Sequence, residues 1–199
     1  MTNLIVLSII LISLLSNINA NDDWPMYHHD PQRTGYIDSM MPDQLEVLWK
    51  YRTGDHIGSS PAVVNNKVYV GSLDDHLYCL DADTGELIWK YKTGDDIESS
   101  PAVVNNKVYV GSLDSYVYCL DANTGELIWK EKPISATSSP AVVNNKVYVG
   151  SWDDHVYCFN AETGELVWRF KAGNDVKSSP AVVNNKVYVG SLDDHLYCL

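Results

Sequence analysis

The chain has 199 residues and a formal net charge of −12, because 26 Asp and Glu residues outnumber 14 Lys and Arg residues. An acidic surface of this strength repels phosphate backbones, so we expect no nucleic-acid partner. The acidity serves either cation binding or plain solubility, and solubility is the simpler interpretation.

Residues 1–20 are typical of a signal peptide. Leu4–Leu15 is an apolar run, and a short polar stretch then ends in the small residue Ala20. The run is short for a membrane span. It has no Lys or Arg before it, which leaves an uncleaved anchor as the alternative. No cysteine that could carry a lipid precedes Cys79. We therefore expect a secreted or extracytoplasmic chain, in the periplasm or at the cell surface, without a lipid anchor.

Residues 21–58 form a predicted N-terminal segment. It contains one β-prone stretch, residues 45–52, which carries Trp49 and has no strands of its own before it. We expect this stretch to form a single outer strand of the sheet structure that follows.

Residues 59–199 are an internal repeat. The twelve residues Pro-Ala-Val-Val-Asn-Asn-Lys-Val-Tyr-Val-Gly-Ser occur four times unchanged, at intervals of 40, 39 and 40 residues. They begin at Pro61, Pro101, Pro140 and Pro180. Such a period indicates one supersecondary unit that is stacked several times. The predicted copies are residues 59–98, 99–137 and 138–177, and an incomplete fourth copy at 178–199.

Each copy predicts four short antiparallel strands. In the first copy these are residues 61–64, 67–72, 76–81 and 86–92, separated by turn-forming residues such as Asn65-Asn66 and Thr84-Gly85. Strands of this number and spacing are typical of a β-propeller blade. The third strand is apolar on both faces, as expected for a blade with neighbours on both sides. The predicted fold class is therefore all-β, a propeller of about four blades.

Counting residues outward from Thr84, at the centre of a predicted hairpin, places Cys79 opposite Trp89. The same count in the next two copies pairs Cys119 with Trp129 and Cys158 with Trp168. The four cysteines, including Cys198, share one repeat position. Blades keep such positions too far apart for a disulfide, and metal sites use closely spaced cysteine pairs. We expect buried free thiols.

The run from Leu80 to Trp89 resembles the repeat of the pyrroloquinoline-quinone-like (PQQ-like) propeller family. The matching positions are Asp81, Thr84, Gly85 and Trp89; Asp121, Thr124, Gly125 and Trp129; and Thr163, Gly164 and Trp168, with Asn160 in place of the third Asp. The stretch Asp23–Tyr27 also resembles the segment that opens such propellers. The resemblance implies that each tryptophan docks between blades, against a turn of the next one. Cysteine stands where the family has alanine.

The family includes quinoprotein dehydrogenases and an outer-membrane protein assembly scaffold, so the fold alone does not decide the function. The dehydrogenases hold a quinone and Ca²⁺ with a distinct set of Glu, Asn and Asp residues, an Asp base and often adjacent cysteines. No such set stands apart from this repeat, so we expect no catalytic residue, no metal and neither cofactor. His76, His155 and His195 are interpreted as surface residues of polar turns, and Asp81 as an acceptor for turn amides.

The end of the stack leaves three alternatives open. The chain could form an open arc, as a fragment of a longer array would. It could close into a ring of four blades by pairing residues 45–52 with the strand near 195–199. Two chains could also form one ring of eight blades. An open arc would expose apolar edges and self-associate.

We expect a non-catalytic binding scaffold whose partner is a protein or an extracellular ligand. The expected binding surface is formed by the connections between blades, where the copies differ most. These connections are Gly54–Ser59, Gly94–Ser99, Lys132–Ser138 and Gly173–Ser178, with Asp55, His56, Asp95, Asp96, Asn174 and Asp175 as candidate binding residues. The alternatives are a fragment of a quinoprotein dehydrogenase and a scaffold for outer-membrane protein assembly.

Overall fold

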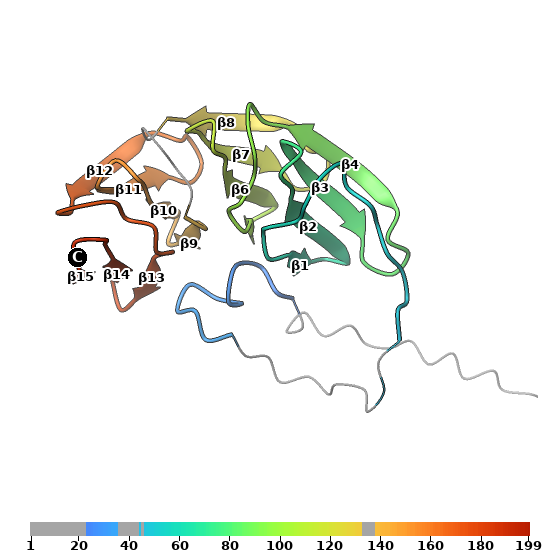
Figure 1. Cartoon of the computed structure of the whole chain (residues 1–199), viewed down its shortest axis with the longest axis horizontal. Coiled ribbons are helices and arrows are strands. Elements are labelled where there is room, and N and C mark those ends of the chain that lie inside the picture. Colours follow the sequence, from blue (N-terminus) through green and yellow to red (C-terminus); the bar gives the residue numbers. More distant parts are fainter. Residues whose placement is uncertain (1–22, 36–43, 45, 133–137) are drawn as a thin grey trace, which may run out of the picture.

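The computed structural model describes residues 23–35, 44, 46–132 and 138–199, and its strands form four antiparallel sheets (Figure 1). The predicted signal peptide and most of the connection Lys132–Ser138 lie outside the described residues. No helix among the described residues is long and apolar enough to cross a membrane.

Three sheets have four strands each, in sequence order, and the last sheet has three. Blade 1 contains β1 (Ala62–Val64), β2 (Lys67–Gly71), β3 (His76–Asp81) and β4 (Leu87–Lys92). Blade 2 contains β5 (Ala102–Val104), β6 (Lys107–Gly111), β7 (Val117–Asp121) and β8 (Leu127–Glu131). Blade 3 contains β9 (Ala141–Val143), β10 (Lys146–Gly150), β11 (His155–Asn160) and β12 (Leu166–Lys171). Blade 4 contains β13 (Ala181–Val183), β14 (Lys186–Gly190) and β15 (Leu196–Cys198). The predicted all-β propeller architecture is confirmed.

The turns form where the sequence places residues that tolerate positive φ. Asn65 and Asn66 have φ values of 50° and 59°, as a tight hairpin between β1 and β2 requires. In the next hairpin, Gly85 has a φ of 72°, and the Asp81 carboxylate accepts a hydrogen bond of 2.8 Å from the Thr84 amide. The predicted role of Asp81 in this turn is confirmed.

The predicted pairing of Cys79 with Trp89 is confirmed, as are its two equivalents. A β-bulge lies beside this pair, however, so Leu80 lies opposite Leu87. From this point towards the turn, the observed pairing differs by one residue from the predicted one. The bulge adds one unpaired residue on one strand. It leaves the Cys and Trp side chains on the same face, where they enter the core.

The core lies between neighbouring blades. In one cluster, Leu77 and Cys79 of blade 1 pack with Val108 and Leu120 of blade 2, and all four side chains are buried. Equivalent clusters join blade 2 to blade 3 and blade 3 to blade 4. Each blade is therefore stabilised mainly by its neighbours, as in other repeat proteins.

The blades form an open arc. β1 packs beside β5, β5 beside β9 and β9 beside β13, while blades 1 and 4 lie at opposite ends (Figure 1). The alternative of closure into a four-blade ring is not what the structure adopts. Residues 46–52, expected as an outer strand, form no strand ladder with any described residue, because the edge of β15 lies at the other end of the arc.

Residues 23–35, which we call the inner segment, run along the concave side of the arc (Figure 1). Trp24 and Val63 exchange backbone hydrogen bonds of 2.6 and 2.7 Å, which attaches the segment to β1 in blade 1. The Val103 amide donates to the Pro25 carbonyl at 2.6 Å, which attaches it to β5 in blade 2. The segment thus covers the free edge of the first two inner strands.

The inner segment continues to the other two blades. The Val182 amide of blade 4 donates to the Pro31 carbonyl at 2.8 Å. The partly buried guanidinium of Arg33 donates to backbone carbonyls of blades 3 and 4, at Ser139 (3.2 Å) and Pro180 (3.1 Å). Burial lowers the pKa of Arg33 to about 10, which leaves the side chain charged at neutral pH. One segment therefore joins all four blades.

Candidate functional site

The candidate site is one end of the blades, which we call the rim. It combines the connections that enter each blade with the turns between the second and third strands, because antiparallel strands bring both to the same end. The described parts of the rim are residues 54–58, 72–75, 94–98, 112–115, 151–154, 173–177 and 191–194.

In blades 1, 2 and 4, an aspartate of this turn holds the connection that enters the same blade. In blade 1, Asp74 Oδ2 accepts hydrogen bonds of 2.6 Å from the Gly54 amide and from the Tyr78 hydroxyl. Burial opposes ionisation of Asp74, but these hydrogen bonds outweigh it and lower its pKa. Burial and the bond to Asp74 raise the pKa of Tyr78 to about 12. The same arrangement recurs with Gly94 and Asp114 (2.8 Å) and with Gly173 and Asp193 (2.9 Å).

In the described connections into blades 2 and 4, an apolar residue packs against the preceding blade and so holds the loop from its other side. Ile97 is fully buried against Gly71 of the preceding blade, where a Cβ atom would collide with it. Val176 lies in the same way against Gly150. The rim loops are therefore held between two blades and present their polar residues on a rigid framework.

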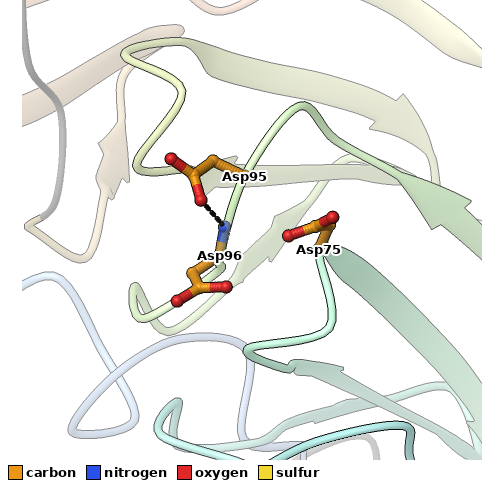
Figure 2. A group of neighbouring side chains, drawn as sticks. All are labelled: Asp75, Asp95 and Asp96. Atoms are coloured by element: carbon orange, nitrogen blue, oxygen red, sulfur yellow. Dashed lines mark hydrogen bonds between the residues drawn. The ribbon is translucent and has the colours of Figure 1, made fainter.

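Three rim carboxylates converge at the joint between blades 1 and 2. Oxygen atoms of Asp75, Asp95 and Asp96 lie within 4.8 Å of one another (Figure 2). The Asp96 amide also donates a hydrogen bond of 3.0 Å to Asp95 Oδ1. Desolvation, and then repulsion from Asp95 and Asp75, raise the pKa of Asp96. The group therefore concentrates negative potential at one point of the rim.

The sequence predicts Asp95 and Asp96 at this rim, but Asp75 is not among the candidate binding residues that it indicates. The signal was present, since a turn between the second and third strands must lie at the same end as the connection after the fourth. The structure does not gather the other candidates into the same group. Asp55 and His56 contact each other at 2.6 Å at the blade 1 end, and Asn174 and Asp175 lie on the connection into blade 4.

The repeat tryptophans join neighbouring blades at the turns between the third and fourth strands, which lie at the end opposite the rim. The indole N–H groups of Trp49, Trp89 and Trp129 donate to carbonyl oxygens in the turn of the following blade. These bonds reach Ala82 (2.9 Å), Ala122 (3.1 Å) and Ala161 (3.1 Å). Each indole ring lies against the glycine of that turn, respectively Gly85, Gly125 and Gly164.

Trp168 differs from the other tryptophans. No described turn of blade 4 covers it, so its ring is partly exposed and lines an open pocket with Tyr148, Val187 and Leu199. The inter-blade docking that the resemblance implied is therefore found for three of the four repeat tryptophans.

The cysteines form no disulfide among the described residues. Cys79, Cys119 and Cys158 are buried, and burial raises their pKa values to about 12, 12 and 11. The expectation of burial is wrong for Cys198, which is exposed because no strand of the described residues pairs with the outer edge of β15.

The recurring histidines contact their own turns. Nδ1 of His76, His155 and His195 lies 2.6, 2.7 and 2.7 Å from the backbone carbonyl of the aspartate two residues earlier. Each histidine belongs to a different blade, so they do not form a common site.

Comparisons with known proteins identify a family. The profile of the family described as outer membrane protein assembly factor BamB matches residues 33–132 and 113–199. No curated protein matches the chain significantly in sequence.

Several solved structures share the fold. BamB from Moraxella catarrhalis superposes with a TM-score of 0.70 and 23% identity, over 76% of this chain and 49% of that one. The quinohemoprotein alcohol dehydrogenase ADHIIG from Pseudomonas putida HK5 gives 0.76 and 24%, over 84% of this chain and 34% of that one. The computationally designed Ika4 protein gives 0.71 and 21%, over 78% and 98%. The chain thus spans half or less of the two natural neighbours.

Proposed function

The chain belongs to the PQQ-like repeat family described as outer membrane protein assembly factor BamB, and from this premise we propose that it is a non-catalytic binding scaffold. It acts outside the cytoplasm, in the cell envelope or as a secreted protein, and holds a protein partner against its rim. The family description, which names an assembly factor, supports a role in bringing proteins together.

The observation that carries the proposal is the convergence of Asp75, Asp95 and Asp96 from two blades onto one point of a rigid rim. Hydrogen bonds such as that from the Gly94 amide to Asp114 keep the loops ordered before binding. A preorganised surface loses little conformational entropy when a partner docks. The negative potential favours a partner segment rich in Lys or Arg.

A dehydrogenase role is the alternative that the structural neighbours raise, and their names imply a quinone and a haem group. A planar quinone needs an aromatic face to stack on. The rings of Trp49, Trp89 and Trp129 are instead packed on glycines of the next blade, and the recurring histidines contact their own turns. These tryptophans and histidines are thus engaged in contacts within the fold, and the proposal assigns no cofactor, no metal and no catalytic step to this chain.

Titration with charged peptides tests the proposal. A fluorescent, unstructured lysine-rich peptide is added to the full chain, and anisotropy reports binding; a glutamate-rich peptide of equal length serves as the comparison. We expect the lysine-rich peptide to bind more tightly, and to bind more weakly as salt is added. The triple variant Asp75→Asn, Asp95→Asn, Asp96→Asn should raise the dissociation constant by about tenfold or more.

A matched variant separates the rim from overall charge. Asp83→Asn, Glu126→Gln and Glu165→Gln also remove three negative charges, but from exposed turns at the opposite end of the blades. Binding should remain near the wild-type value in this variant. Equal losses in both triple variants, or no preference for the basic peptide, would overturn the rim as the binding surface.

A further inference from the structure

The outer strands β4, β8 and β12 lie on the convex side of the arc (Figure 1). Each is the last strand of its sheet, so one edge pairs with the third strand of the blade and the other edge faces no described strand. All three belong to four-stranded blades in the interior of the sequence, so this arrangement does not depend on where the chain begins or ends. A free strand edge is a template for another strand unless the protein blocks it.

Each outer strand begins with two apolar side chains that remain exposed. The pairs are Leu87-Ile88, Leu127-Ile128 and Leu166-Val167, and their exposed fractions lie between 42% and 51%. The tryptophan that follows each pair is by contrast buried or half-buried. An apolar pair that recurs at the same place in three blades offers a repeated contact surface.

The same strands concentrate positive charge on an acidic protein. β4, β8 with the following Lys132, and β12 carry six of the 14 Lys and Arg residues but only one acidic residue, Glu131. The six basic side chains are all exposed: Lys90, Lys92, Lys130, Lys132, Arg169 and Lys171. The whole chain has a net charge of −12, so the outer strands differ in sign from the rest of the molecule.

These positive charges are mostly unpaired within the chain. Lys92 approaches Asp75 at 3.7 Å, and none of the other five forms an ion pair with a described carboxylate. Lys90 Nζ lies 5.8 Å from the centre of the Tyr78 ring. Such a cation–π contact holds the ammonium group beside the sheet without neutralising it. The outer edges therefore suit a partner that brings negative charge.

We propose that the outer edges of β4, β8 and β12 accept an extended, acidic segment of a partner protein as a fifth strand. In β4, alternation places Lys90 and Lys92 on one face of the sheet. Acidic residues two positions apart on the added strand lie opposite them, and opposite charges directly across two strands stabilise the pairing. Backbone hydrogen bonds of the added strand supply affinity. The site differs from the rim in place and in charge, and does not depend on the proposed function of the rim.

The β-bulge in each outer hairpin limits the length of this ladder. Ile88 has no partner in the register of β3 with β4. A bulge disrupts the ladder at its own position, so the added strand pairs with residues 89–92 and its end lies beside Leu87 and Ile88. The partner segment therefore needs apolar residues at one end and alternating acidic residues along the rest.

A partner protein fits these edges better than a second copy or a membrane does. Two outer strands of this chain paired with each other would bring their Lys and Arg residues close together, which is unfavourable. A flat bilayer can touch few of the outer strands at once, because they follow the curve of the arc (Figure 1). An added strand meets each blade separately, so the curvature is no obstacle to it.

Binding of a designed peptide tests the proposed strand addition. The fluorescent probe has two valines followed by alternating glutamate and threonine; unlike a uniformly glutamate-rich peptide, it has strand-forming residues and an apolar end. We expect saturable binding to the full chain by anisotropy, with slower hydrogen exchange in β4, β8 and β12. The same peptide with N-methyl groups on alternate residues cannot form the ladder and should bind about tenfold more weakly or worse. Equal binding of the two peptides, or protection outside the outer strands, would overturn the proposal.

Matched variants separate the outer edges from overall charge. One triple variant removes a positive charge from each outer strand: Lys90→Gln, Lys130→Gln and Arg169→Gln. The other removes three lysines that begin second strands, which pair on both edges: Lys67→Gln, Lys146→Gln and Lys186→Gln. The first should raise the dissociation constant of the probe about threefold to fivefold, as the loss of a cross-strand ion pair does, and the second should leave it near the wild-type value. Equal losses would mean that the probe senses net charge alone, against the proposal.

Two measurements test the other classes of partner. Sedimentation with phosphatidylglycerol vesicles tests a lipid surface, and we expect the chain to remain in the supernatant. Hydrogen exchange without peptide, at increasing protein concentration, tests a second copy, and the outer strands should exchange at a constant rate. Vesicle binding that is lost in the first triple variant would assign these edges to a membrane, and concentration-dependent protection of the outer strands would assign them to a second copy; either result would replace the proposal.

Discussion

At the scale of single residues, the contacts of Trp49, Trp89 and Trp129 with the next blade each depend on a glycine that meets the indole ring. Gly125 has a φ of 73°, and an added Cβ atom would lie 2.7 Å from the Trp89 ring. Two requirements therefore act on one residue: a left-handed backbone and the absence of a side chain. This explains why the Thr-Gly turn and the tryptophan recur together in the repeat, since each glycine receives the tryptophan of the preceding unit.

The substitution Gly125→Ala should lower the free energy of unfolding by about 3–5 kcal/mol, a loss typical of a disrupted core contact. Gly35→Ala is the matched control. Gly35 has a φ of 62° but no atom within 4 Å of an added Cβ, so only the backbone cost of about 1 kcal/mol applies. Urea unfolding followed by tryptophan fluorescence measures both. Similar losses in the two variants would mean that the indole contact contributes little.

At the scale of elements, the inner segment connects blades that otherwise contact only their neighbours. Arg33 is central to this connection, because its guanidinium donates to the carbonyls of Tyr27, Ser139, Pro140 and Pro180. A planar group with five donors suits such a set of carbonyls better than an ammonium group does. The segment thus restrains the arc in a way that the repeat itself does not.

The substitution Arg33→Ala should reduce the free energy of unfolding by about 2–4 kcal/mol, because several backbone carbonyls lose their donor. Arg169→Ala removes the same charge from an exposed side chain on β12 and should cost less than about 1 kcal/mol. Chemical denaturation gives the energies, and hydrogen exchange shows where protection is lost. We expect the loss in blades 3 and 4; unchanged exchange there would contradict the role of the inner segment.

At the scale of the whole molecule, the same buried thiol occurs in each complete blade, so its effect on stability is repeated. Burial raises the pKa of Cys79 and Cys119 to about 12, from an ordinary value of 9.0. The unfolded chain therefore releases these protons first as the pH rises. The stabilisation is fully present below pH 9 and is lost progressively between pH 9 and the folded-state values.

The free energy of unfolding should accordingly fall between pH 9 and pH 11, by roughly 1–2 kcal/mol for each buried thiol. The variant Cys119→Ala removes one of these groups and restores the residue that the family has at this position. It should show a shallower decline than the wild type in denaturation curves recorded at several pH values. A decline of equal steepness would assign the alkaline effect to the buried tyrosines, whose pKa values are also raised.

Much of the fold followed from local signals. The identical twelve-residue segments predicted β1 and β2 and their copies, because Asn-Asn turns and β-branched residues act over a few residues. The pairing of Cys79 with Trp89 followed from the length of one hairpin, while the bulge beside it did not, because counting along a hairpin assumes that each residue has one partner on the other strand. On the rim, Asp95 and Asp96 were found from variation between copies, whereas Asp75 lay in a turn whose position relative to them required the assembled blades.

The sequence alone determined the blade, its strands, the cysteine opposite the tryptophan and the likeness to PQQ-like propellers, because each of these is encoded within one period of the repeat. Only the tertiary structure decided how the copies are arranged: an open arc, an inner segment across all four blades, Trp49 seated on blade 1 and Cys198 exposed at the far end. These features depend on contacts between separate copies or segments, such as Trp49 with Ala82, 33 positions apart, and Arg33 with Ser139, 106 positions apart. The repeat is the same in every copy, and therefore carries no information about where the stack begins, bends or closes.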